Sequence, residues 1–200
     1  MASRVPAAWV EQLAPGGRLL TTLVSRTPSW PGQVLVTRTR AGRAGAVLRG
    51  RPRGYRPMLG YQWLSALDQR ARVEAEPGTA RATKLAPSPD DAYGFWLAAA
   101  HLAPGLVRDF QAATMTVVAP EDGSWAVAGP GDGIVRVHGP RDVWAEVEAV
   151  HAGWERAGRP DTYRVDLHDG AASQPVSSGP GPTALRWTLP PLDTVPRQMP

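Results

Sequence analysis

The sequence of 200 residues contains no cysteine and only one lysine, Lys84. Without cysteine, the chain can form no disulfide, no thiolate metal site and no cysteine nucleophile. No apolar run approaches the roughly 18 residues that a membrane-spanning helix requires. Glu11 and Gln12 interrupt the apolar residues near the N-terminus, where a signal peptide needs a continuous apolar segment. The sequence therefore predicts a cytoplasmic protein without a membrane segment.

Acidic residues are almost missing from the first part of the chain. Residues 1–60 hold ten arginines and a single acidic residue, Glu11, whereas residues 61–200 carry twelve basic and seventeen acidic side chains. Such a basic block attracts either the phosphates of nucleic acid or an acidic protein surface. Charge alone does not choose between them, and we expect nucleic acid to be the less favoured partner. The preference for arginine over lysine indicates GC-rich codon usage more than selection for anion binding.

The first 50 residues predict a helix, a strand and a hairpin in that order. Pro6 suits the first turn of a helix that continues to Leu13 and is stopped by the glycines that follow. Residues 18–24 form a nearly continuous apolar run, which predicts a strand covered on both faces. Residues 33–39 and 44–49 alternate between apolar and polar side chains, which is typical of a β-hairpin.

The remaining sequence predicts a short helix and then a second unit. Residues 62–73 suit a short helix, and residues 74–87 lack an apolar period and are interpreted as a linker. Ser88 then predicts the N-cap of a helix that continues to Leu102. We expect strands at 113–119, 124–128, 134–138, 162–167 and 184–189, and a helix at 141–157 with an apolar stripe. Residues 171–183 are interpreted as an insertion between the last two strands, and residues 191–200 as a disordered tail.

Several sequence features suggest chemistry, but each has a plainer explanation. The four histidines lack the close spacing of a metal site. The glycine-rich stretch 129–133 has no dinucleotide-binding spacing and is better interpreted as a hairpin turn. Trp144 and Trp154 lie on or beside the apolar stripe of residues 141–157 and therefore predict core packing.

Two stretches resemble a known enzyme family. The sequence VPAAWVEQLAPGGRLLTTL, residues 5–23, followed by GQVLVTRTR, resembles the late part of protein L-isoaspartate O-methyltransferases, in which a short helix leads through Pro-Gly-Gly-Arg-Leu into a strand and a hairpin. Residues 139–167 are similar to the C-terminal extension of the branch found beside ATP-grasp peptide maturases. Val5, Pro6, Trp9, Gln12, Leu13, Pro15, Gly16, Gly17, Arg18 and Leu19 carry the first resemblance. Gly139, Pro140, Trp144, Glu148, Trp154, Gly158, Arg159 and Pro160 carry the second.

The resemblance implies a fold class and an activity. Residues 1–60 would be the C-terminal remnant of a Rossmann-like methyltransferase sheet in an α/β protein, residues 61–87 a short helix and linker, and residues 88–190 a small α+β C-terminal domain. The family implies S-adenosylmethionine-dependent methylation of a carboxylate of a peptide or protein, with a role in ribosomal peptide maturation. No glycine-rich cofactor motif follows a first strand here, so no catalytic or cofactor residue is assigned. The resemblance therefore predicts a truncated chain, inactive alone, whose strand at 18–24 has lost its parallel neighbours.

Two alternatives remain open beside the truncated methyltransferase. The chain could be a non-catalytic module that binds a peptide or a partner such as an ATP-grasp maturase, or an arginine-rich nucleic-acid binder that uses residues 38–56. For peptide recognition the candidate residues are Arg51, Arg53 and Tyr55, because they follow the hairpin on the side where active sites of the family open. Arginine at these positions would suit carboxylates.

Overall fold

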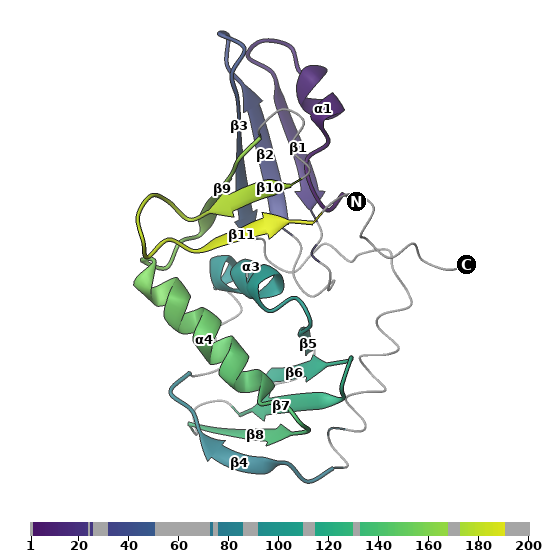
Figure 1. Cartoon of the computed structure of the whole chain (residues 1–200), viewed down its shortest axis with the longest axis vertical. Helices are drawn as coiled ribbons and strands as arrows, with labels where there is room; N and C mark the ends of the chain where they lie inside the picture. The colour runs from purple at the N-terminus through teal and green to yellow at the C-terminus, as the bar shows by residue number, and fades with distance from the viewer. Residues whose placement is uncertain are drawn as a thin grey trace, which may run out of the picture.

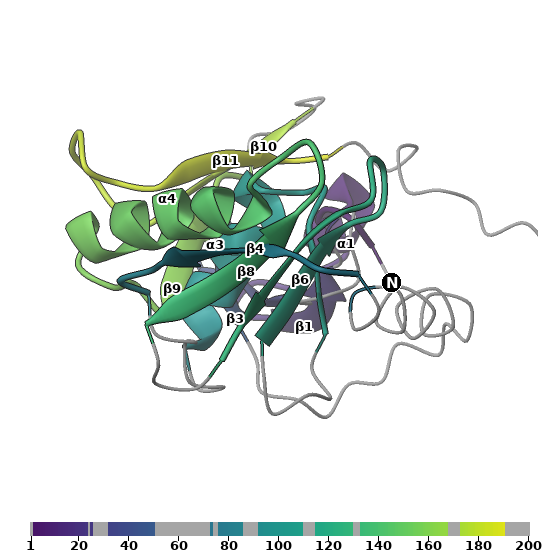
Figure 2. The same ribbon diagram turned by 90° about the horizontal axis from the view of Figure 1, so that it is seen from below.

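The computed structural model describes residues 2–23, 25, 32–50, 73, 76–85, 92–109, 115–129, 133–167 and 173–190. It contains two antiparallel sheets with two long helices between them, so the protein has the mixed α/β composition expected from the sequence (Figure 1). Seen from below, the sheet formed by the middle of the chain lies in front of the helix formed by residues 93–102 (Figure 2). Among the described residues, no helix has the length and apolar character needed to cross a membrane.

One sheet has six strands and combines the beginning of the described chain with its end. Its order is β1-β2-β3-β9-β10-β11, and every neighbouring pair is antiparallel. The strands are β1 (Arg18–Leu23), β2 (Gly32–Arg38), β3 (Ala44–Gly50), β9 (Thr162–Val165), β10 (Gln174–Ser177) and β11 (Arg186–Leu189). The short helix α1 (Ala7–Glu11) precedes β1.

The other sheet has five strands, all from the middle of the chain, in the order β4-β8-β7-β6-β5. Its strands are β4 (Thr79–Ala82), β5 (Val107–Asp109), β6 (Met115–Ala119), β7 (Ser124–Ala128) and β8 (Ile134–His138). Between the two sheets lie α3 (Tyr93–Leu102) and α4 (Val143–Arg156) (Figure 1). The six-stranded sheet, the helix layer and the five-stranded sheet thus form three layers.

Helix α3 joins the layers and is buried on all sides, with seven consecutive buried residues from Gly94 to Ala100. A helix that is apolar all round has to lie in the core. The Tyr163 hydroxyl of β9 donates a buried hydrogen bond of 2.7 Å to the Gly94 carbonyl. A Cβ added at Gly94 would lie 2.2 Å from the Pro160 carbonyl oxygen, so only glycine allows this close approach.

The order of elements predicted for the first 50 residues is confirmed. Helix α1, the turn at Gly16 with its φ of 82°, strand β1 and the β2–β3 hairpin follow one another as expected. The apolar alternation fixes the hairpin register, because Val34, Val36 and Leu48 face the core. The predicted helix at 141–157 is also confirmed as α4, with Trp144 and Trp154 buried as core residues.

The prediction that residues 18–24 are covered on both faces is wrong. Strand β1 lies at the edge of the six-stranded sheet, pairs with β2 in antiparallel orientation, and leaves Leu20 57% exposed. On the edge of β1 that faces away from β2, an isolated parallel β-bridge joins Ala2 to Leu23. A continuous apolar run can occur in a half-exposed strand because one outward face has no covering layer. A Rossmann-like sheet is parallel, and these antiparallel sheets do not confirm one.

Two stretches predicted to lack regular structure contain strands. The supposed linker 74–87 holds β4, which pairs with β8, and the supposed insertion 171–183 holds β10, which lies between β9 and β11. The six-stranded sheet also crosses the boundaries predicted at residues 60 and 88, because β3 pairs directly with β9. The proposed N-cap Ser88 lies outside the described residues, and the described part of α3 begins at Tyr93.

The N-terminal segment is held against the far end of the chain by a side-chain amide. The Val5 N–H donates to Gln174 Oε1 at 2.9 Å, and Gln174 Nε2 donates to the Val5 carbonyl at 2.7 Å. Both groups are buried, so the amide satisfies two backbone groups that would otherwise lack partners. Residues 2–5 are thereby fixed to β10.

Candidate functional site

The three residues predicted to bind a peptide, Arg51, Arg53 and Tyr55, lie outside the described residues. Their role therefore stays a prediction. The most extensive network of polar side chains in the described part of the chain lies elsewhere, between β4 and the start of α4.

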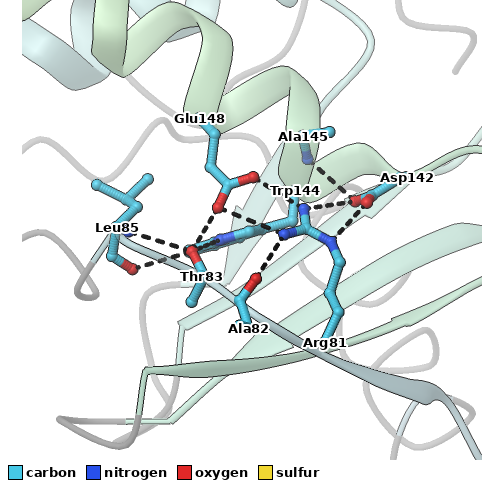
Figure 3. Close-up of polar contacts among 8 residues, drawn as sticks. All are labelled: Arg81, Ala82, Thr83, Leu85, Asp142, Trp144, Ala145 and Glu148. Carbon is cyan, nitrogen blue, oxygen red and sulfur yellow. Dashed lines mark hydrogen bonds and ion pairs between the residues drawn. The ribbon is translucent and has the colours of Figure 1, made fainter.

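This network consists of five residues and is called the Arg81 network here (Figure 3). Arg81 extends from β4 and contacts two carboxylates of the α4 segment. Its Nε and Nη2 atoms donate to the two oxygens of Asp142 at 2.7 and 3.2 Å, and Nη2 also donates to Glu148 at 2.9 Å. Thr83 and Trp144 complete the network. The fork of the guanidinium suits this paired contact with a carboxylate.

The hydroxyl of Thr83 connects the remaining members. It donates to Glu148 Oε1 and accepts a 2.8 Å hydrogen bond from Nε1 of Trp144, whose side chain is fully buried. It also accepts from the backbone N–H of Leu85 at 3.1 Å. The indole N–H of Trp144 thus has a partner in the interior, where an unpaired donor would be costly.

Asp142 has a second role as the N-cap of α4. Its carboxylate accepts a hydrogen bond of 3.0 Å from the backbone N–H of Ala145, which satisfies one of the free donors at the helix start. Burial raises the pKa of Asp142, but the hydrogen bonds from Arg81 and Ala145 outweigh it, so the pKa lies below its usual value. The same ion pairs raise the pKa of Arg81.

The Arg81 network holds β4 against α4. Both acidic side chains share one guanidinium, so their oxygens serve this contact between the strand and the helix segment. We therefore assign the network a structural role. The sequence prediction missed it because Arg81 and Thr83 fell in the supposed linker. The one available signal was the alternation of polar residues and alanine from Thr79 to Thr83, a stretch that lacks any large apolar side chain.

The histidines described in the structure are dispersed. His101 stacks on Trp187 with ring centroids 5.4 Å apart, and burial lowers its pKa to about 4. His138 stacks on Trp125 and lies 3.0 Å from a carboxylate oxygen of Glu76. His151 of α4 packs edge-on against Phe95 of α3. In the described ranges, no three His, Asp or Glu side chains gather as metal ligands would.

The described residues show no Rossmann-type turn of the kind with which the family implied by the resemblance would hold S-adenosylmethionine. A Rossmann-type nucleoside site has a strand that leads through an open glycine turn into a helix. Strand β8 leads through Gly139 into α4, but a Cβ at Gly139 would lie 2.6 Å from Ser124 Oγ, so this glycine packs against protein. The helix start is already occupied by the Asp142 carboxylate. Strands β7 and β8, on either side of the predicted hairpin turn, are antiparallel neighbours, and residues 130–132 of that turn lie outside the described residues.

Comparison with family models, with curated proteins and with solved structures found no match in any of the three.

Proposed function

We propose that this chain serves carboxyl methylation of a peptide or protein as a recognition module, with an ATP-grasp maturase as a candidate partner. The methyl donor would be S-adenosylmethionine, in keeping with the resemblance to protein L-isoaspartate O-methyltransferases. Because the described residues include no Rossmann-type cofactor turn, the proposal assigns them to binding the substrate or a partner.

The observation that carries the proposal is the adjacency of the two segments that resemble the family. They are separated by about a hundred residues in the sequence, yet β3, the hairpin strand that directly follows the first segment, pairs with β9 from the end of the second. The pairs run from Ala46 opposite Val165 to Arg49 opposite Thr162. One resemblance spread over one folded unit is stronger support than two unconnected likenesses.

The residues of the second resemblance also build a specific corner between α4 and β9. Trp154 Nε1 donates to the Pro160 carbonyl at 3.0 Å, and Gly158 and Arg159 both have positive φ angles, of 82° and 55°. A positive φ is unusual for arginine and marks a sharp turn. The corner places β9 beside β3. The residues of the second resemblance therefore have a structural role in the sheet that unites the two segments.

Calorimetry tests the proposal with two titrants. A short flexible peptide with a single isoaspartyl residue should bind this chain, and the same peptide with that carboxylate methyl-esterified should bind at least tenfold more weakly. S-adenosylmethionine should give no heat of binding. Equal affinity for the acid and its ester would contradict carboxylate recognition, and tight binding of S-adenosylmethionine would contradict the assignment to recognition alone.

A further inference from the structure

The outer face of the six-stranded sheet, which is turned away from α3, carries an exposed apolar row. Leu20 of β1 lies opposite Leu35 of β2, which lies opposite Val47 of β3. These side chains are 57%, 38% and 47% exposed. Because adjacent strands lie about 4.8 Å apart, the row is continuous over about 10 Å. Single exposed apolar residues are ordinary, but three in one row form a patch.

Four arginines surround this row on the same face. Arg164 of β9 lies directly opposite Val47, and Arg49 follows Val47 by two residues, which returns its side chain to the same face. Arg18 precedes Leu20 by two residues, and Arg186 shares the face through its place opposite Ser177. All four are exposed.

No outward position of the described strands in this sheet holds an acidic residue. The other outward positions hold threonine, serine, glutamine, glycine or proline. Among the described residues, none of the four arginines has a carboxylate at ion-pair distance. The face therefore combines an apolar centre with surrounding arginines, and the described strands add no acidic side chain to it.

This combination favours a protein partner with acidic side chains. Protein interfaces place apolar side chains at the centre and are enriched in arginine. A single-stranded nucleic acid site would instead present aromatic side chains for base stacking, and the centre of this face is aliphatic. A second copy of the chain is disfavoured because two such faces would bring arginine against arginine.

We propose that the outer face of the six-stranded sheet binds a protein segment that lays aliphatic side chains over Leu20, Leu35 and Val47 and sets carboxylates against the surrounding arginines. The inference goes beyond the proposed function and does not depend on methylation. Its probe contains no isoaspartyl residue, so the two proposals can fail separately.

Fluorescence anisotropy of a labelled synthetic peptide tests the inference. The peptide has a leucine and valine centre flanked by glutamates, and a second peptide carries glutamine in place of every glutamate. The test protein combines Arg49→Glu with Arg164→Glu on the outer face. The matched control combines Arg136→Glu on β8 with Arg156→Glu on α4, which changes the net charge equally at exposed positions away from this face.

The wild-type chain should bind the acidic peptide and bind the glutamine peptide at least tenfold more weakly. The outer-face double variant should lose tenfold or more in affinity for the acidic peptide, and the control double variant less than twofold. Leu35→Ser should also weaken binding, by about threefold, while the circular dichroism spectrum of every variant stays native.

Three outcomes would overturn the inference. Equal loss in both double variants would mean that net charge alone attracts the peptide. Absence of binding by the acidic peptide would mean that the face has no such partner. Tighter binding of duplex DNA than of the peptide, lost in the outer-face variant and unaffected by Leu35→Ser, would assign the arginines to nucleic acid.

Discussion

The two sheets of this protein differ in how many of their faces are covered. Strands β2 and β3 of the six-stranded sheet alternate between buried and exposed residues, whereas all five residues of β6 in the five-stranded sheet are buried. Helix α4 packs on one face of β6 and β7, and Val73 packs with Val118 and Trp125 in a separate cluster. One sheet is thus half exposed, and the middle of the other is enclosed.

Side chains on the open face of the six-stranded sheet are available for binding, whereas side chains in the enclosed middle of the five-stranded sheet are needed for stability. An antiparallel sheet with one open face can change its outward side chains at little cost, because those side chains pack against little. An enclosed sheet tolerates few changes, since each side chain contributes to a close-packed core. The same distinction predicts how strongly substitutions at different positions destabilise the fold.

The largest effect is expected in α3, which packs against β3 and β11 of the six-stranded sheet and against α4. In Gly94→Val, the new Cβ would lie 2.2 Å from a backbone oxygen and 2.8 Å from the Cα of Asp161, neither of which can move freely. We expect a loss of about 3 kcal/mol or more in the free energy of unfolding. Urea denaturation followed by tryptophan fluorescence measures this loss.

Gly45→Val is the matched control, since nothing lies within 4 Å of a Cβ at Gly45 on the open face. It should change stability by less than about 0.5 kcal/mol, because valine suits an exposed strand position. Similar losses at both glycines would remove the contrast between the enclosed and the open parts.

A somewhat smaller loss of stability is expected when the pH is lowered, because His101 of α3 packs against the six-stranded sheet. Burial holds the folded-state pKa of His101 at about 4, below the 6.5 of an exposed histidine. Below pH 6.5 His101 is protonated in the unfolded chain but stays neutral in the folded chain. The free energy of unfolding therefore falls as the pH drops from about 6.5 to 4, and then levels off. The difference between the two pKa values corresponds to about 3 kcal/mol.

Denaturation curves measured at several pH values between 7 and 4 check this prediction. His101→Phe keeps a ring against Trp187 but removes the titration, so its stability should depend less on pH in this window. His151, whose pKa burial also lowers, should account for the remaining slope. An unchanged slope in His101→Phe would show that this histidine can be protonated without unfolding.

The next effect should be confined to β4 and the start of α4. Arg81→Met leaves Asp142 and Glu148, both partly buried, without their shared cation, and we expect a loss of about 2 kcal/mol. Hydrogen exchange should rise in β4 and the first turn of α4 and stay unchanged in β1 to β3. Arg136 on the neighbouring strand β8 is exposed, so Arg136→Met is the control and should change the free energy of unfolding little.

The smallest effect is expected on the open face itself. Leu35→Thr replaces an exposed side chain with one that suits a strand, so the free energy of unfolding should change by less than about 0.5 kcal/mol. The same change at Leu48, which is fully buried on the opposite face, should be strongly destabilising. Thermal unfolding of the two variants compares the faces directly, and a large loss in Leu35→Thr would mean that the outer face is covered within the chain.

Prediction from the sequence worked where the signal was local. The β2–β3 hairpin followed from alternating residues around a turn, and α4 followed from its apolar stripe and from Gly158, which has a φ of 82° after the last helical turn. Prediction failed for β4 and β10, because Thr79–Ala82 and Gln174–Ser177 are short and carry few apolar side chains. Both depend on neighbours that pair with them, β8 for one and β9 and β11 for the other.

The sequence by itself determined where the chain turns, which face of each well-patterned element is apolar, and that the first 60 residues carry an excess of arginine. Only the tertiary structure decided that β3 pairs with β9, that β1 lies at an edge, and that Arg81 meets Asp142 and Glu148. The physical reason is that strands pair through backbone groups that every residue type shares apart from proline. Partners far apart in the sequence are therefore chosen by packing of the whole chain.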